Sequence, residues 1–471
     1  MTVNGRPRIK QTLILQTAEK QAGQIEAVIA AVLFGLALAV RLFRLGQWSF
    51  WPDEVFSFGT KSDGFNDGLL LRSLATDLIK LAVDWLGPSE WSARLVPALI
   101  GALSVPLLYL LLRRALPPPG ALMAGALLVI SPWHLYWSQN ARFYTLLLLF
   151  FNAGLLLFYL GLERDRPWML LASLFLFGMA ARERLAALMG MPALVVYLIA
   201  LPLLRFERPK GLNRRNLLIF FGPALLAGLV MVLPYARNFS GWSTGFGWRN
   251  NDPLFLIAGT MYYVGLPLAV FGAGSGLLAV LRKNRLALLL LLTAVLPLLA
   301  IMATSLVQYA ANRYIFFSLF SWVALGGLGM QMLLEHLPRP AQVAGLVVAA
   351  TLLAASAGDA FLYFTVQKGN RDDWRSALQF IGERAQPGDS IVTRDMDIVN
   401  YYLGEGRLNI LTWDAAPPGT GRVWYLEDMI VAEQFPGQLA RVMQAADPMA
   451  EYDVTLPGRT YRMRVYFEEI P

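Results

Sequence analysis

Long apolar stretches, separated by short polar or basic connections, dominate the chain from residue 26 to residue 365. A helix of about 20 apolar residues is long enough to cross the roughly 30 Å hydrocarbon layer of a bilayer. The pattern predicts about eleven such spans: 26–43, 93–113, 119–136, 142–162, 167–182, 185–204, 215–236, 253–281, 285–307, 312–334 and 341–365. The apolar–polar alternation that is typical of an outer-membrane barrel does not occur. We therefore expect an all-α polytopic membrane protein.

The first connection, residues 44–92, is long and differs from the others. It begins with the polar stretch Trp51-Pro52-Asp53-Glu54 and continues into Leu69–Leu86, which is apolar but interrupted by charges. Four charged residues are too many for a membrane span, so we expect Leu69–Leu86 to form a helix that lies in the membrane interface.

The pattern changes again after Lys368, where charged residues become frequent and long apolar runs stop. Ser390–Thr393, Val423–Leu426 and Tyr461–Phe467 have the composition of short strands. We predict two domains: a transmembrane catalytic domain at 1–366 and a small α/β extramembrane domain at 367–471.

Composition agrees with the membrane assignment and excludes several kinds of site. The chain is 56% hydrophobic and 15% charged, whereas soluble domains carry roughly 25% charged residues. The absence of cysteine excludes disulfides and thiolate metal sites, and only His134 and His336 could supply imidazole ligands. We attribute the net charge of +8 to basic cytoplasmic loops and not to nucleic-acid binding.

Lysine and arginine also predict the orientation of the chain. With a cytoplasmic N-terminus, every inner connection carries basic residues: Arg113-Arg114, Arg164 with Arg166, Arg205–Arg215, Arg282–Arg285 and Arg339. An odd number of spans then puts the C-terminal domain outside the cytoplasm. We expect a multi-pass protein that is integral to the plasma (inner) membrane.

Polar residues from distant parts of the chain share the predicted outer face. They are Asp53, Glu54, Arg94, His134, Gln139, Asn140, Arg142, Tyr144, Arg182, Glu183, Arg313 and Tyr314. Ionisable groups at membrane helices are costly and are usually paired or functional. A carboxylate can take a proton from a hydroxyl group, and an arginine can stabilise the charge of a departing phosphate. The set therefore favours group transfer with an anionic leaving group.

Four motifs on this face resemble those of a known family. They are Asp53-Glu54 after the first span, Leu86–Glu90 leading to Arg94–Ala98, Ser138–Tyr144, which contains an Ala-Arg-x-Tyr element, and Asn312-Arg313-Tyr314. Their types and order resemble the GT-C superfamily of membrane glycosyltransferases. The similarity is closest to the family 39 group, which is protein mannosyltransferase-like and aminoarabinose transferase-like.

The resemblance implies a function and a role for each residue. The donor would be a polyprenyl-phosphate-linked sugar, and the acceptor hydroxyl would belong to a lipid, a glycan or a protein. Asp53 would be the general base of a single inverting displacement, and Glu54 would orient the acceptor or assist Asp53. The lipid phosphate would be held by Arg142 and Arg313 with Tyr144, and less certainly by Arg94. Arg182, Glu183, Tyr314 and His134 are further possible substrate contacts.

The chain departs from the family pattern just before the Ala-Arg-x-Tyr element. Many relatives carry an acid there, whereas this chain has Gln139 and Asn140. Because a second acid helps to bind the cation in metal-dependent members, we expect no required cofactor, and a divalent cation is not favoured.

Other interpretations remain open at this point. The chain could be a transporter or flippase for lipid-linked sugars, or a receptor-like protein with degenerate enzyme helices. Asp53 and Glu54 could simply be solvated, and arginines at span ends often only reach toward the interface. His134 fits an aromatic belt, and Arg182-Glu183-Arg184 fits a hairpin ion cluster.

Overall fold

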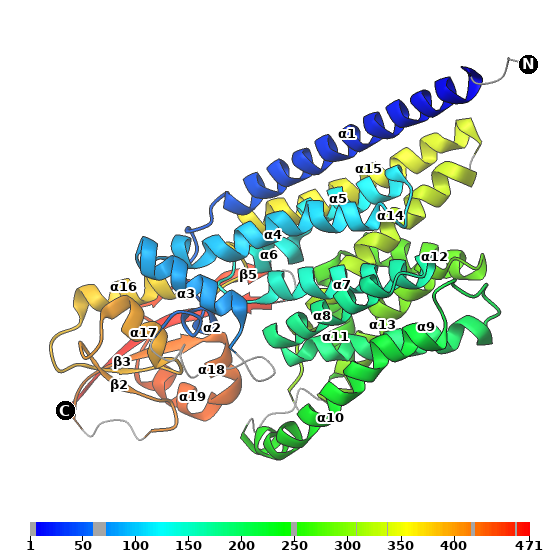
Figure 1. Cartoon of the computed structure of the whole chain (residues 1–471). Helices are drawn as coiled ribbons and strands as arrows, with labels where there is room; N and C mark the ends of the chain where they lie inside the picture. The colour runs from blue at the N-terminus through cyan, green and yellow to red at the C-terminus, as the bar shows by residue number, and fades with distance from the viewer. Residues whose placement is uncertain are drawn as a thin grey trace, which may run out of the picture.

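A computed structural model describes residues 6–59, 72–245, 252–307, 309–336, 338–415, 420–456 and 459–471. Figure 1 shows an elongated bundle of helices with a smaller α/β domain at one end. The N-terminus lies at the opposite end of the bundle from that domain.

The bundle is built from long apolar helices whose contacts are made by leucine, alanine, glycine and aromatic side chains. Each predicted span overlaps one helix or one pair of consecutive helices. In chain order these elements are α1 (Arg6–Leu42), α4 (Glu90–Leu112), α5 (Pro118–Ile130), α6 (Pro132–Ser138), α7 (Tyr144–Arg164), α8 (Pro167–Glu183), η2 (Leu185–Gly190), α9 (Met191–Leu203), α10 (Arg214–Gly245), α11 (Pro253–Val264), α12 (Leu266–Leu281), α13 (Arg285–Ser305), η3 (Asn312–Ser318), α14 (Leu319–His336) and α15 (Arg339–Phe364).

Within the described ranges, seven helices are long and apolar enough to cross a membrane, or nine if each of two bent pairs forms one span. Two of the predicted spans are therefore not straight. The first bends by 54° between α5 and α6, and the second by 97° between α11 and α12. A proline follows each break, Pro132 and Pro267, and proline cannot donate the backbone hydrogen bond that would continue a helix. Gly265 at the sharper break has φ +88°, a conformation that suits glycine.

Two short helices follow α1 in the first connection: α2 (Pro52–Val55) and α3 (Leu74–Leu86). α3 confirms a helix within the predicted segment Leu69–Leu86, whose first three residues lie outside the described ranges. Its side chains Leu81, Trp85 and Leu86 are exposed, as expected for a helix that lies in the membrane interface.

The tail domain follows α15 and contains seven strands and four helices in its described part. The strands are β1 (Ser390–Val392), β2 (Asn409–Leu411), β3 (Gly421–Asp428), β4 (Ala450–Glu451), β5 (Val454–Leu456), β6 (Arg459–Tyr461) and β7 (Met463–Ile470). The helices are α16 (Trp374–Arg384), α17 (Met396–Leu403), α18 (Met429–Gln434) and α19 (Pro436–Ala445).

Five of these strands form one sheet in the order β2-β1-β3-β7-β4. β1 is parallel to both β2 and β3, whereas β7 is antiparallel to β3 and β4. The three predicted strands correspond to β1, β3 and β7, so the predicted α/β character of the tail is confirmed. The separate β5–β6 hairpin and the short strands β2 and β4 were not predicted.

The tail domain and the first connection share one hydrophobic core. Phe50 and Val55 from the connection pack with Trp374, Ile398 and Val399 from the tail. Figure 1 accordingly shows α2 and α3 beside α16 and α17. Because this core continues from the tail domain into the first connection, apolar burial holds the tail domain against the loop that carries Asp53 and Glu54.

Candidate active site

The Asp53–Glu54 pair lies on the single turn of α2, and its two carboxylates have different surroundings. The Glu54 side chain is fully buried, whereas that of Asp53 is 29% exposed. The turn is fixed locally because the Trp51 backbone N–H donates to Glu54 Oε2 at 3.2 Å, as in a capping box. Although they are neighbours in sequence, Asp53 is partly exposed and Glu54 faces the protein interior.

Besides the Trp51 amide, Glu54 is bound by two arginines and the backbone amide of Ala141. Arg94 donates to both carboxylate oxygens at 2.8 Å, and Arg371 donates to Oε2 at 2.6 Å. The Ala141 N–H donates to Oε1 at 2.8 Å. Burial tends to raise the pKa of Glu54, but the charges of Arg371 and Arg94 outweigh that effect and lower the pKa below its usual value. Glu54 is therefore an ionised residue of the protein interior. The sequence predicted that Glu54 orients the acceptor or assists Asp53, but in this structure its carboxylate does not face an open site.

Arg94, which is predicted as a phosphate ligand, is bound by protein acceptors in this structure. Besides its two bonds to Glu54, it donates to the carbonyls of Leu45, Trp48 and Ser49 at 2.8–3.3 Å. A guanidinium has five N–H donors, and all five are used here by protein acceptors. We call Glu54, Arg94 and Arg371 the closed cluster.

Asp53 faces a second group of arginines. Its Oδ2 lies 3.5 Å from NH1 of Arg313 at the start of η3. Arg142 donates from NH1 to the Asp53 carbonyl at 3.0 Å and to Ser57 Oγ at 3.3 Å. The predicted base and the two main predicted phosphate ligands are therefore brought together.

Two tyrosines connect these arginines with a third. Arg184 lies over the Tyr314 ring at 4.5 Å, and Arg313 lies over the same ring at 5.7 Å. Tyr144 interacts electrostatically with Arg184, Arg313 and Arg142. We call Asp53, Arg142, Arg184 and Arg313 the open cluster. Arg184 is absent from the predicted site residues, although its position in the charged triplet 182–184 was a signal for it.

The other two members of that triplet have supporting roles. The buried Glu183 carboxylate accepts hydrogen bonds from Ser73 Oγ and from the Leu74 and Ala75 amides at 2.6–3.1 Å. It therefore satisfies free donors at the positive N-terminal end of α3. Arg182 donates to the Arg72 carbonyl at 3.1 Å. In this structure both residues hold the first connection and do not join the open cluster. Their substrate contacts stay a prediction.

His134 is also outside the open cluster. It is enclosed between helices, with Nδ1 at 2.5 Å from Arg41 NH2 and Nε2 at 3.3 Å from Ser104 Oγ. Arg41 also donates to the Leu128 and Val129 carbonyls at the end of α5, where Pro132 cannot serve as a donor. His134 therefore belongs to a buried polar contact that stabilises the α5–α6 break. A substrate contact of His134 stays a prediction.

The tail domain reaches the open cluster through the end of β1. Arg394 interacts electrostatically with Asp53, and it forms ion pairs with Asp395 and Asp428. Burial raises the pKa of Asp395 to about 7, and Arg394 opposes that shift only in part. Asp53 therefore lies between membrane helices on one side and the tail domain on the other.

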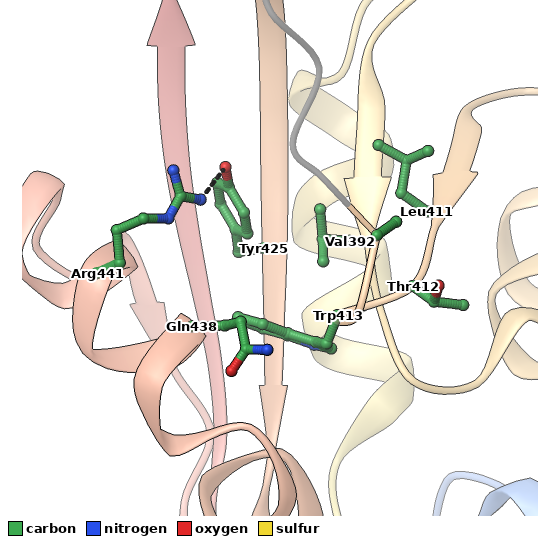
Figure 2. Close-up of a pocket in the computed structure, with 8 residues that line it drawn as sticks. Val392, Leu411, Thr412, Trp413, Tyr425, Gln438 and Arg441 are labelled. Atoms are coloured by element: carbon green, nitrogen blue, oxygen red, sulfur yellow. Dashed lines mark hydrogen bonds between the residues drawn. The ribbon is translucent and has the colours of Figure 1, made fainter.

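A separate small pocket in the tail contains no acid. It is lined by residues near the ends of β1, β2 and β3 and on α19, including Trp413, Tyr425, Gln438 and Arg441. Figure 2 shows Arg441 directed at the Tyr425 hydroxyl, to which it donates at 3.2 Å. Without a carboxylate or a free-standing base among its lining residues, this pocket does not match the chemistry predicted for Asp53.

Among the described residues, no three His, Cys, Asp or Glu side chains are grouped so that they could hold a metal ion. The prediction that no divalent cation is required is a question for experiment.

The chain was compared with protein families, curated proteins and solved structures. Residues 74–236, about a third of the chain, match the family model "Dolichyl-phosphate-mannose-protein mannosyltransferase". No curated protein matches the sequence. Arg94, Arg142 and Arg184 lie within the matched range, and Asp53 and Glu54 precede it.

Solved structures match the chain over almost its whole length. The apo structure of ArnT from Cupriavidus metallidurans has a TM-score of 0.57 at 16% identity, and the match covers 95% of this chain and 98% of that one. The same protein bound to undecaprenyl phosphate has a TM-score of 0.54 at 17% identity, with 93% and 97% covered. The oligosaccharyltransferase AglB from Archaeoglobus fulgidus, in complex with an inhibitory peptide and a dolichol-phosphate, has a TM-score of 0.56 at 12% identity, with 93% and 74% covered.

These matches show that the chain shares the overall fold of ArnT and AglB. Together with the family-model match over residues 74–236, they confirm the resemblance indicated by the four sequence motifs.

Proposed function

We propose that the protein is an inverting glycosyltransferase that moves a sugar from a polyprenyl-phosphate donor to an acceptor hydroxyl on the outer face of the membrane. The observation that carries the proposal is the open cluster, in which a partly exposed carboxylate lies 3.5 Å from Arg313 and beside Arg142. The reaction needs a base and a cationic site for a phosphate leaving group next to each other.

The geometry suggests how the base and the arginines act together. A donor phosphate would compete with Asp53 for Arg313, whose Nε has no hydrogen-bond partner among the described residues. The phosphate would thereby bind between Arg313 and Arg142, and the Asp53 carboxylate would become available to the acceptor. Asp53 then takes the hydroxyl proton while the acceptor oxygen attacks the anomeric carbon. The bond from that carbon to the phosphate oxygen breaks, and the polyprenyl phosphate leaves as an anion beside the arginines.

Support for this donor class comes from the structural neighbours, which were solved with undecaprenyl phosphate and with a dolichol-phosphate. The acceptor is a lipid, a glycan or a protein. The proposal places the protein in the plasma membrane, with a cytoplasmic N-terminus and the tail domain outside, so that the open cluster faces the extracytoplasmic side.

A transfer assay tests the proposal. Purified protein in lipid vesicles is incubated with a panel of polyprenyl-phosphate sugars and acceptors, with and without EDTA, and released polyprenyl phosphate is measured. We expect release by the wild type, survival of that activity in EDTA, and a loss of about 1,000-fold or more in Asp53→Asn because general-base catalysis is removed. Asp84→Asn, an exposed carboxylate change in the same connection, is the matched control and should retain activity.

Two results would contradict the proposal. Near-normal turnover in Asp53→Asn would remove the base assignment. Movement of intact lipid-linked sugar across the vesicle membrane without release of polyprenyl phosphate would favour a flippase.

A further inference from the structure

Arg371 connects the tail domain to the two segments that carry the open cluster. It lies between α15 and α16, and its side chain is 1% exposed. NH1 donates to Glu54 Oε2 at 2.6 Å, and NH2 donates to the Gln139 carbonyl at 2.6 Å. One rigid guanidinium therefore binds the residue next to Asp53 and a residue three positions before Arg142.

These contacts form a closed ring with Glu54. The Glu54 carboxylate accepts from Arg371 and also from the Ala141 amide at 2.8 Å. The segment 139–142 is thus held at Gln139 by Arg371 and at Ala141 by Glu54. Because Arg142 in turn donates to the Asp53 carbonyl, the distance between the base and a phosphate-binding arginine depends on this ring.

The charges in the closed cluster indicate what the loss of Arg371 would do. Glu54 faces two buried arginines, and its two bonds to Arg94 do not involve Arg371. Removing Arg371 therefore leaves the buried Glu54–Arg94 ion pair intact, so no isolated buried charge is created. What is lost is the link from the tail segment to Gln139 and Glu54.

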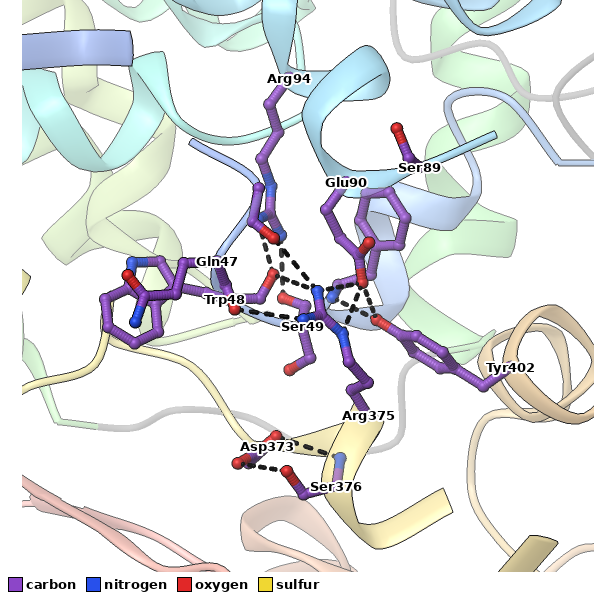
Figure 3. Close-up of polar contacts among 12 residues, drawn as sticks. Gln47, Trp48, Ser49, Ser89, Glu90, Arg94, Asp373, Arg375, Ser376 and Tyr402 are labelled. Atoms are coloured by element: carbon purple, nitrogen blue, oxygen red, sulfur yellow. Dashed lines mark hydrogen bonds and ion pairs between the residues drawn. The ribbon is translucent and has the colours of Figure 1, made fainter. Parts of the chain in front are cut away.

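A second tail arginine, Arg375, provides a comparison within the same interface. It bonds Glu90 Oε1 at 3.0 Å and the carbonyls of Gly46, Gln47 and Trp48 at 3.3–3.4 Å. Figure 3 shows Arg94 and Arg375 on opposite sides of the loop that contains Gln47, Trp48 and Ser49. Arg375 is 37% exposed and contacts neither Glu54 nor residues 139–142 through any described hydrogen bond.

We propose that Arg371 is a positioning residue for transfer: it holds Asp53 and Arg142 in register, which makes the tail domain part of the catalytic unit. This inference rests on the function proposed above. A displacement of about 1 Å can cost on the order of 100-fold in rate when reacting groups must be aligned, so the effect should appear in kcat.

The test uses the full-length protein in lipid vesicles and compares Arg371→Gln, Arg371→Lys and Arg375→Gln with the wild type. For each variant, kcat, the donor KM, binding of polyprenyl phosphate and the melting temperature are measured. We expect Arg371→Gln to lower kcat about 100-fold, with phosphate-lipid binding within about threefold of wild type because Arg142 and Arg313 are retained. Arg371→Lys keeps the charge but cannot make both bonds in the same geometry, so it should recover part of the lost rate. Arg375→Gln should stay within about threefold of wild type, because Arg375 is partly exposed and has no described hydrogen bond to Glu54 or to residues 139–142.

The outcomes separate the two proposals. An inactive wild type would overturn the proposed function, and this inference with it. An active wild type with normal kcat in a folded Arg371→Gln variant would overturn the positioning role alone. Equal losses in Arg371→Gln and Arg375→Gln, without recovery by lysine, would show that the interface as a whole matters and that Arg371 has no particular role. If Arg371→Gln does not fold, the kcat of Arg371→Lys decides, and a normal value would overturn the inference.

Discussion

The closed cluster and the open cluster use the same residue types and lie next to each other, yet they differ in burial and in how far the protein itself uses their arginine donors. In the closed cluster, Glu54 is fully buried, and every N–H donor of Arg94 has a protein acceptor. In the open cluster, the side chains of Asp53 and Arg313 are 29% and 26% exposed, and their single ion pair is long at 3.5 Å.

The difference shows why arginine content alone does not identify a phosphate site. A guanidinium whose five donors are saturated by the protein can only hold structure, because a ligand would first have to displace those bonds. Arg313 has a long ion pair with Asp53 and lies over the Trp51 and Tyr314 rings, and its Nε has no hydrogen-bond partner among the described residues. Such a guanidinium can bind a phosphate at a lower cost than one whose donors are all used. We therefore assign stability to the closed cluster and ligand exchange to the open cluster, and three changes test this division.

The largest effect is expected from Glu54→Gln. This change leaves two buried arginines without their carboxylate, which typically costs about 3–5 kcal/mol of folding free energy. The variant should show a large fall in melting temperature or fail to fold, as measured by thermal unfolding and size-exclusion chromatography. Glu90→Gln, whose partner Arg375 is 37% exposed, is the control and should cost about 1 kcal/mol or less. A stable Glu54→Gln variant with impaired transfer would instead support the catalytic role predicted from the sequence.

A smaller effect, and one on activity alone, is expected from Arg313→Gln. Loss of a cation that stabilises leaving-group charge should lower kcat/KM about 100-fold, which corresponds to roughly 2.7 kcal/mol. Melting temperature should change less than in Glu54→Gln, because the ion pair of Arg313 is long and its other described contacts are with the Trp51 and Tyr314 rings. Arg182→Gln is the matched control from the same outer face. It should affect initial rates by less than about threefold, since Arg182 contacts Arg72 and Asp77. A larger loss in Arg182→Gln than in Arg313→Gln would reverse the assignment.

The smallest effect concerns Asp395, at the edge between the tail domain and the open cluster. Its pKa is raised to about 7 by burial, against about 3.9 in an unfolded chain. Between these values the folded protein keeps a proton that the unfolded chain releases, so stability falls as pH rises toward 7. Asp395→Asn should therefore raise the melting temperature by a few degrees at about pH 8 and by less at about pH 5. The exposed change Asp447→Asn in the same domain is the control. A gain that is equal at both pH values would contradict this explanation.

The membrane architecture could largely be predicted from the sequence, because apolar length is a direct physical requirement of the bilayer. Each of the eleven predicted spans overlaps one helix or a pair of helices, but only seven to nine spans in the described ranges are long and apolar enough to cross a membrane. Asp53, Arg142, Tyr144, Arg313 and Tyr314 were correctly placed near one another. The breaks at Ser131 and Gly265 were not predicted, although Pro132, Pro267 and Gly265 were local signals for them.

The individual roles of the charged residues could not be predicted, because they depend on burial and on partners that are far away in sequence. Asp53 and Glu54 are adjacent, and only the fold decides that Glu54 turns inward toward Arg371, 317 residues away. Likewise, Glu183 and Arg184 are neighbours, yet one binds the start of α3 and the other lies over Tyr314. Sequence patterns predicted a functional outer face but did not distinguish its structural residues from those proposed to take part in the reaction.

The contact between Glu183 and the first turn of α3 has a consequence for the depth of Arg184 relative to the membrane surface. α3 exposes Trp85, which is 81% accessible, beside Leu81 and Leu86, and tryptophan prefers the level of the lipid headgroups. Glu183 binds the first turn of α3, and Arg184 follows directly in the chain. With α3 in the interface, as we expect, this contact would set the depth of an open-cluster arginine near the level of the lipid phosphates, where the proposed lipid-linked donor would meet it.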